Sequence, residues 1–206
     1  LVLQDFASLK NTIIDSVHNG YGTERSDIIK TLEEQRAMDP QQLKDRFWDM
    51  FIVDALIGNW DRHNGNWGFL YDSRTDEISL APVYDCGSCL FPQADEEIMK
   101  RTLEDPAELE LRIFERPLSG IKENSQKIQY FKFISSLKNP DCNKALKRIV
   151  PRINMNQIYG LIETTPFLSE LQRNFYRTML RARKERILDF SLQKLRKRER
   201  LREQSR

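Results

Sequence analysis

Several residue types that mark particular protein classes are scarce in this 206-residue sequence. No apolar run is long enough to span a membrane, because the longest, from Met50 to Ile57, is interrupted by Asp54. No signal-peptide pattern follows Leu1, and a first residue other than Met suggests that the native start lies further upstream. We therefore expect no membrane partner and a cytoplasmic location.

Cysteine and histidine are also scarce, with three and two residues respectively. Cys86 and Cys89 form a C-x-x-C pair, a pattern compatible with half of a zinc site or with a redox pair. No second pair completes a zinc site, and an odd number of cysteines does not make a disulfide framework. Free thiols in a reducing cytoplasm are the favoured interpretation.

The composition is that of an ordinary soluble protein, with 39% hydrophobic and 31% charged residues. The length suits one domain or one large lobe with appendages. Residues 181–206 contain eleven Lys and Arg against four Asp and Glu, a net charge of +7. The rest of the chain carries −5, which gives the net +2 of the whole sequence. A solvated helix end and an arm for nucleic acid or anionic lipid both fit such a tail. The aromatic residues that single-strand binding needs are absent after Phe190.

The apolar periodicity predicts a mainly helical chain with a small β-hairpin. A buried helix is expected from Pro40, with Asp39 as its N-cap and Gly58 as its stop. The hairpin is expected over residues 67–71 and 78–83, and residues 86–120 are expected to be irregular. A strand is predicted over residues 1–3, a helix through 28–32 capped by Thr23 or Ser26, and helices over 126–137, 141–150, 154–162 and 168–200.

Two oxygen-bearing side chains stand five residues apart in the loop that follows the buried helix, at Asp61 and Asn66. A third, Asp85, stands at the exit of the hairpin, one residue short of a glycine. Protein kinases use the same three side chains in this order: an Asp that takes the substrate hydroxyl proton, then an Asn and an Asp that hold Mg²⁺. One amide and one carboxylate oxygen suffice for Mg²⁺ beside ATP. The pattern predicts ATP- and Mg²⁺-dependent phosphoryl transfer, although such spacing also occurs in ordinary turns.

The neighbours of Asp61 admit more than one role. Arg62 suits a clamp on a phosphorylated residue or on a backbone carbonyl, and equally a plain surface arginine. His63 suits a contact to the phosphates, polarisation of the Asp, or a brace within the loop. We take Asp61, Arg62 and His63 as the candidate catalytic residues. Asp54, on the helix, is expected to be a structural hydrogen-bond acceptor.

The segments 55–67 (ALIGNWDRHNGNW) and 80–85 (LAPVYD) resemble the C-terminal domain of HipA-like serine/threonine kinases. Those carry N-x-L-I-G-N-x-D-x-H-x-x-N and then L-x-P-x-Y-D. The resemblance implies a protein-kinase-like C-terminal lobe with Asp61 as catalytic residue and Asn66 and Asp85 as Mg²⁺ ligands. It also implies a protein Ser/Thr acceptor and, from the bacterial toxins of the family, a DNA-binding antitoxin-type partner.

The loop is also similar to that of phosphatidylinositol 3- and 4-kinases. In those enzymes the metal-binding Asp follows the Asn after a shorter gap, and a Phe separates it from the glycine. Here Cys86 stands in that place, so a phosphatidylinositol or small-molecule kinase is the second hypothesis.

A complete kinase also needs an N-terminal lobe with a glycine-rich loop and a strand lysine that grips the phosphates. The sequence has eight glycines and none in that pattern before the loop, while residues 1–5 look like a strand and hinge. We therefore expect residues 1–206 to form a single HipA-like C-terminal lobe, with 168–206 a long basic helix. The N-terminal lobe would then be absent, because the chain is a piece of a kinase or half of a split kinase, and we expect weak or no ATP turnover. A non-catalytic kinase-like binding module is the third hypothesis.

Overall fold

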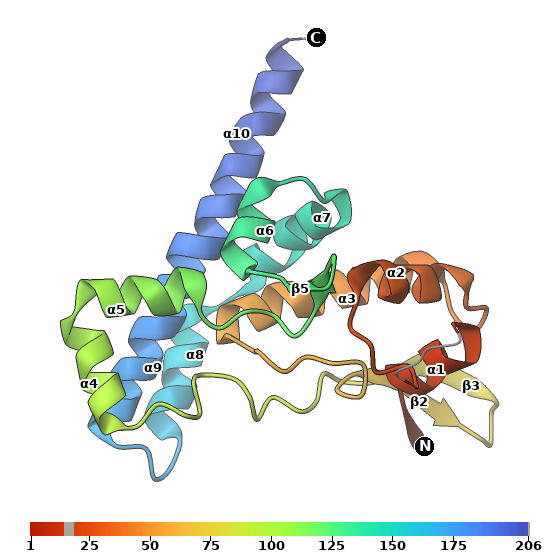
Figure 1. The fold of residues 1–206 in the computed structure, drawn as a ribbon, viewed down its shortest axis with the longest axis horizontal. Coiled ribbons are helices and arrows are strands. Elements are labelled where there is room, and N and C mark those ends of the chain that lie inside the picture. Colours follow the sequence, from red (N-terminus) through yellow and green to blue (C-terminus); the bar gives the residue numbers. More distant parts are fainter. Residues whose placement is uncertain (15–18, 206) are drawn as a thin grey trace.

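The structure, a computed structural model, describes residues 1–14 and 19–205. Residues 15–18, which include His18, and Arg206 lie outside the described part. As expected, the described part is mainly helical, and its strands form one three-stranded sheet and one short two-stranded ribbon (Figure 1). None of the described helices combines the length and the apolar character that crossing a membrane requires.

Helix α3 (Pro40–Ile57) is the central element of the fold (Figure 1). The side chain of Asp39 accepts a hydrogen bond from the backbone N–H of Gln42, and Gly58 ends the helix in the left-handed conformation, so both predicted ends are confirmed. Half of its eighteen residues are buried, because other helices pack against it. It therefore holds the loop that follows on a rigid support.

The sheet lies at one end of α3 and contains the predicted hairpin, β2 (Gly68–Asp72) and β3 (Glu77–Leu80). Strand β1 (Val2–Asp5) pairs antiparallel with β2, so the sheet has three strands in the order β1-β2-β3. A side chain at Gly68 would lie 2.1 Å from the carbonyl oxygen of Gln4, so β1 can approach only a glycine there. This pairing attaches the N-terminal residues to the end of the loop.

Helix α1 (Phe6–Ile13) follows β1 and contacts it, and α2 (Arg25–Glu34) packs against α1 and α3. The N-cap of α2 is Glu24, so the predicted caps Thr23 and Ser26 are wrong. The carboxylate of Glu24 instead accepts hydrogen bonds from backbone N–H groups of residues 124 and 125, about a hundred positions away. A long-range contact has therefore displaced the local capping pattern.

The expectation of an irregular segment over residues 86–120 is wrong for residues 96–115. These form α4 (Glu96–Glu104), α5 (Pro106–Glu110) and a π-helical turn (Leu111–Glu115). α5 and the π-helical turn were missed because they are five residues each, whereas α4 has both an N-cap, Asp95, and apolar residues at helical spacing, Ile98, Met99 and Leu103, a signal that was overlooked.

The helix predicted over residues 126–137 begins later than expected. A short ribbon of β4 (Lys122–Glu123) and β5 (Gln126–Lys127) occupies its start, so α6 covers only Tyr130–Ser136. The pairing of β5 with β4, and not helix propensity, therefore determines the structure of residues 126–127.

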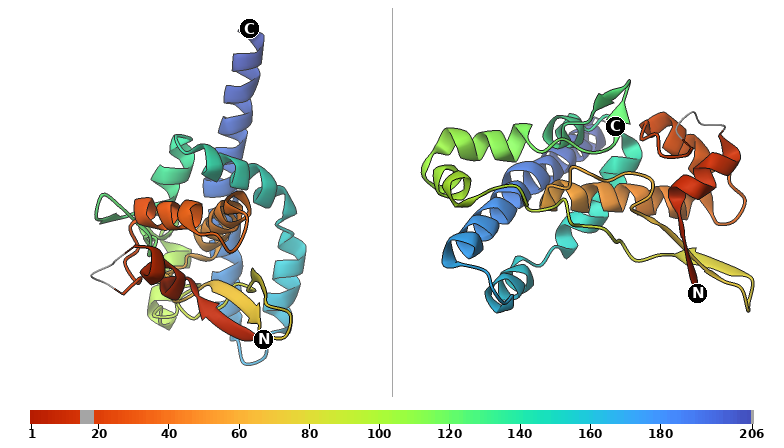
Figure 2. Two further views of the ribbon diagram at one scale, coloured as in Figure 1. Left: turned by 90° about the vertical axis from the view of Figure 1, so that its right-hand side faces the viewer. Right: turned by 60° about the horizontal axis from the view of Figure 1, so that its bottom comes forward.

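The remaining helices agree with the prediction: α7 (Pro140–Ile149), α8 (Met155–Thr164) and a long C-terminal path. That path is α9 (Glu170–Arg183) and α10 (Phe190–Gln204), joined through a π-helical stretch over residues 184–189. Figure 2 shows α10 extending away from the other elements. Its basic residues are partly used for packing, since Lys194 and Arg198 donate to the carbonyls of Ser135 and Leu137 at the end of α6.

Candidate active site

The loop between α3 and β2 is fixed at its start by Asn59, which is fully buried. Its backbone N–H donates to the carbonyl of Asp54 at 3.0 Å, and its side-chain amide donates to the Asp54 carboxylate at 3.0 Å. Its carbonyl accepts a hydrogen bond of 2.6 Å from the Tyr130 hydroxyl, and its Oδ1 accepts from the backbone N–H of Asp61 at 3.1 Å. The backbone before Asp61 is therefore held from both sides.

Arg62 is the centre of the site's hydrogen-bond network. Its Nε and Nη2 donate to the two carboxylate oxygens of Asp54 at 2.9 and 3.0 Å. Its Nη1 donates to the carbonyl of Asn66 at 2.7 Å and to that of Tyr84 at 2.9 Å. One guanidinium thus joins the end of the loop to the residue before Asp85. The interpretation as a backbone-carbonyl clamp is confirmed, and that as a surface arginine is wrong, since Arg62 is 1% exposed.

The charge on Arg62 is stable despite this burial. Burial by itself lowers the pKa of the guanidinium, but the hydrogen bonds and attraction of Asp54 outweigh it, so the pKa lies above its ordinary value. Two charges this deep are tolerated because the pair is bidentate and the remaining donor is satisfied. The loop therefore depends on an ion pair that water does not reach.

Asp61 and Asn66 belong to the loop that Arg62 holds, and Asp85 follows Tyr84, whose carbonyl Arg62 also binds. The Asn66 side-chain amide donates to the carbonyl of Asp61 at 2.9 Å, which leaves its Oδ1 without a donor among the described residues. The half-buried carboxylate of Asp61 lies 3.5 Å from the Ser88 hydroxyl. Asp85 is exposed, and its backbone is left-handed (φ 54°), a conformation that Asp tolerates better than most residues.

These oxygens fit a hard cation better than a soft one. Nowhere in residues 1–14 and 19–205 do three or more His, Cys, Asp or Glu side chains cluster as a metal cage would require. A metal held by Asn66 and Asp85 would therefore need oxygens from water and from a bound phosphate. That is the usual situation of Mg²⁺ beside a nucleotide.

His63 and Asn64 brace the loop. The Nδ1 of His63 accepts a hydrogen bond from the backbone N–H of Gly65 at 3.0 Å. The buried amide of Asn64 donates to the carbonyls of Gly20 and Gly22, in the connection between α1 and α2, at 2.6 and 2.8 Å. The bracing role considered for His63 is thus present, and Asn64 ties the loop to a second segment.

Comparison with known proteins adds a family to this geometry. The family model described as the HipA-like C-terminal domain matches residues 1–158. This chain belongs to the HipA-like C-terminal domain family. The serine/threonine-protein kinase CtkA of Helicobacter pylori is 47% identical over 188 residues, which cover 91% of this chain and 58% of that protein. The crystal structure of the H. pylori proinflammatory kinase CtkA superposes with a TM-score of 0.90 at 45% identity, covering 94% of this chain and 70% of that one.

The C-x-x-C pair stands beside the site of this HipA-like domain but shows no feature of a metal or redox centre. Both thiols are free, with Cys86 exposed and Cys89 partly buried. Burial and the neighbouring Cys86 raise the pKa of the Cys89 thiol to about 12, so it is protonated and poorly nucleophilic at neutral pH.

Sequence patterns missed two contributors to the loop. Ser88 places its hydroxyl near Asp61, as described above. A side chain at Gly120 would lie 2.5 Å from the carbonyl oxygen of Arg62, so only glycine allows these two backbones to meet. No local signal could have identified Gly120, because the contact joins positions 58 residues apart.

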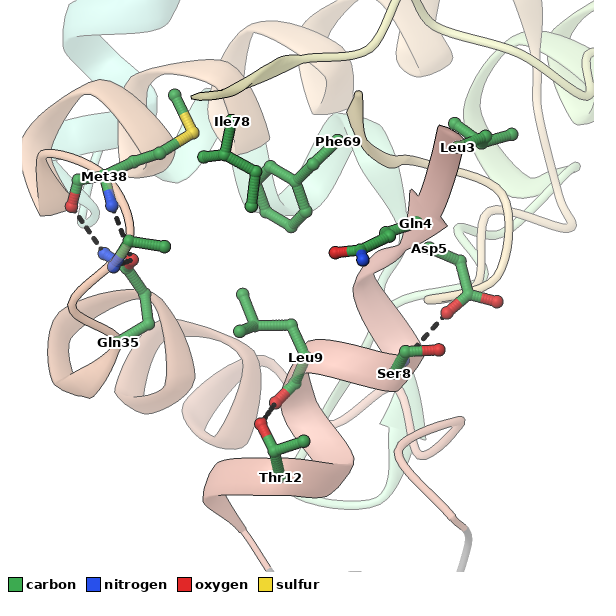
Figure 3. Close-up of a pocket in the computed structure, with 11 residues that line it drawn as sticks. Leu3, Gln4, Asp5, Ser8, Leu9, Thr12, Gln35, Met38, Phe69 and Ile78 are labelled. Carbon is green, nitrogen blue, oxygen red and sulfur yellow. Dashed lines mark hydrogen bonds between the residues drawn. The ribbon is translucent and has the colours of Figure 1, made fainter. Parts of the chain in front are cut away.

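A separate pocket opens between the sheet, α1 and the turn before α3 (Figure 3). It has a volume of about 400 Å³ and apolar walls that include Leu9, Met38 and Phe69. No residue of the loop 58–67 lines it, and its one acidic side chain, Asp5, accepts the N-terminal hydrogen bond of α1. We therefore take the loop, and not this pocket, as the candidate active site.

Proposed function

We propose that this chain supplies the catalytic loop and the metal ligands for ATP- and Mg²⁺-dependent phosphoryl transfer to a Ser or Thr hydroxyl of a protein. The main support is the position of Arg62, which donates to the carbonyls of Asn66 and Tyr84 with the same nitrogen. That contact brings together two segments whose side chains, Asn66 and Asp85, have the chemistry of Mg²⁺ ligands. The similarity to the kinase CtkA supports the same reaction.

In this proposal each residue has one task. The Asp61 carboxylate would accept a hydrogen bond from the acceptor hydroxyl and take its proton as the oxygen attacks the γ-phosphorus of ATP, whose bond to the bridging oxygen breaks to release ADP. Asn66 and Asp85 hold Mg²⁺, which when bound offsets the charge of the phosphates. Arg62 and His63 were candidate catalytic residues, but their contacts favour positioning roles, in which they orient the loop without touching the substrate.

The groups that grip the nucleotide phosphates are proposed to lie outside residues 1–206. The chain spans 58% of the length of CtkA. Its sequence has no glycine-rich phosphate loop before residue 58. The proposal therefore concerns one half of an active site, and its test needs the intact protein.

The test is transfer of radiolabelled γ-phosphate to protein by the intact protein, with Asp61→Asn and Asp85→Asn as variants. Each should lower the rate by at least about a hundred-fold, which corresponds to roughly 2.7 kcal/mol of transition-state stabilisation. Asp61→Asn should retain Mg²⁺-nucleotide binding in calorimetry, whereas Asp85→Asn should lose it. Asp76→Asn, an exposed Asp that is also left-handed (φ 57°), is the matched control. Full activity of either site variant would remove the role assigned to it.

The same assays on the intact protein distinguish two alternative functions. A phosphatidylinositol or small-molecule kinase would transfer the label to lipid or metabolite and not to protein. A binding module would show no Mg²⁺-nucleotide binding even as the intact protein. The antitoxin-type DNA-binding partner implied by the family stays a prediction.

A further inference from the structure

A second pocket, of about 430 Å³, adjoins the catalytic loop through Trp60, the residue before Asp61. It lies where the start of the loop meets the extended segment before α4 and the turn after α5. The residues that define its character are Trp60, Phe91, Ile98, Arg112, Arg116 and Pro117. Trp60 is thus shared between this pocket and the loop that carries Asp61.

The apolar wall of the pocket is held rigidly. Leu90 and Phe91 both have left-handed backbones (φ 57°), which costs bulky residues free energy and often marks a functional site. The backbone N–H of Leu90 donates to the carbonyl of Ile57 at 2.8 Å, which attaches this strained turn to the end of α3. The ring of Phe91 packs edge-on against Phe175, with centroids 5.8 Å apart. The wall is therefore in place before any ligand arrives.

The charge in the pocket is of one sign. Among the described residues that line it, two are arginines and none is acidic. Arg112 is largely engaged, because its Nε donates to the Thr102 hydroxyl at 2.8 Å and its Nη2 lies 3.7 Å from Glu108. Arg116 is exposed, and no carboxylate of the described residues lies within ion-pair distance of it. A free cation at the edge of an apolar wall suits a ligand that has both an apolar and an anionic group.

We propose that this pocket binds the acceptor segment of a protein substrate, with an apolar side chain against Phe91 and Pro117 and an Asp or Glu side chain at Arg116. This inference rests on the proposed function, because it assumes that the acceptor hydroxyl lies at Asp61. Trp60 lines the pocket and is the residue before Asp61, so one extended segment is expected to reach from the pocket to Asp61. The pocket would make the enzyme select acidic acceptor sequences.

The experiment uses the intact protein and two fluorescein-labelled peptides with a central Ser and one Leu. One peptide has Glu at the second to fourth positions on both sides of the Ser, and its twin has Lys there. Binding is followed by fluorescence polarisation without nucleotide, and phosphate transfer is measured separately. We expect the Glu peptide to bind about ten-fold more tightly, the factor that one charge-assisted hydrogen bond supplies. Arg116→Gln should remove this preference, and Arg116→Glu should reverse it.

Arg152→Glu is the matched control, because Arg152 is exposed and lies outside the pocket. It should keep the preference, and an unchanged urea midpoint of each variant shows that the fold is intact. Equal binding of both peptides, or a preference that survives Arg116→Glu, would overturn the assignment of the pocket. If phosphate is transferred at the same rate whatever the flanking charge, the proposed function is supported and the pocket's role is refuted. If acidic peptides bind through Arg116 but no phosphate is transferred, the pocket's role is supported and the proposed function is refuted.

Discussion

The ion pair between Asp54 and Arg62 allows a quantitative test of how the loop is held. Both residues are 1% exposed, and the pair has two hydrogen bonds of 2.9 and 3.0 Å. Asp54→Asn keeps the size of the side chain but leaves the guanidinium without its counter-charge. Arg62→Met leaves the carboxylate buried alone. Breaking a buried pair from one side costs about 3–5 kcal/mol, so each variant should lose that much free energy of unfolding.

The assay is urea unfolding followed by tryptophan fluorescence, because Trp48 and Trp67 are buried at 1% and 2% exposure and report the core. With a slope of roughly 3 kcal/mol/M, each single variant should lower the midpoint by about 1–2 M. The double variant Asp54→Asn with Arg62→Met should be more stable than the sum of the singles implies. We expect a coupling of about 2–3 kcal/mol, since neither charge is then left alone.

The function of the double variant is expected to stay low although part of its stability returns. Without Arg62, nothing donates to the carbonyls of Asn66 and Tyr84 together, so the loop and the Asp85 segment lose their common anchor. Mg²⁺-nucleotide binding by the intact double variant, measured by calorimetry, should be at least ten-fold weaker than that of the unmodified protein. Strictly additive stability losses, or single losses below about 1 kcal/mol, would refute the reasoning. So would full nucleotide binding by the double variant.

Three further predictions concern other parts of the site. Gly120→Ala should lower the free energy of unfolding by about 1–3 kcal/mol in the same urea assay, because the new methyl would lie 2.5 Å from the Arg62 carbonyl oxygen; an unchanged midpoint would contradict the close approach. Ser88→Ala should slow phosphate transfer by the intact protein roughly three- to ten-fold without changing nucleotide affinity, because its hydroxyl lies near the loop carboxylate at 3.5 Å; a change in affinity alone would argue against this role. Iodoacetamide at pH 8, followed by mass spectrometry, should label Cys86 first, because burial raises the pKa of Cys89 to about 12, and labelling of Cys89 should increase only as the pH approaches that value; equal labelling at pH 8 would contradict it.

The parts of the fold predicted from the sequence are those encoded by near neighbours. The start of α3 follows from Asp39 and Pro40, and its end from Gly58, since capping and left-handed stops depend on single residues within one turn. The hairpin over β2 and β3 follows from alternation and a polar turn for the same reason. Between residues 96 and 115, α5 and the π-helical turn are too short and bury too few side chains to show a period, whereas α4 has helical apolar spacing and a capping Asp95 that could have been recognised.

Residue type and spacing alone identify Asp61, Asn66 and the later Asp85 as candidates for the proposed chemistry. The role of Arg62 could be read only from the folded chain, since its partners lie 8 and 22 positions away and meet it only there. The same is true of the pocket beside Trp60, whose arginines come from a segment about fifty residues further along the chain. Spacing encodes which atoms a loop presents, whereas burial and long-range hydrogen bonds decide which side chains hold the loop and which remain free to meet a substrate.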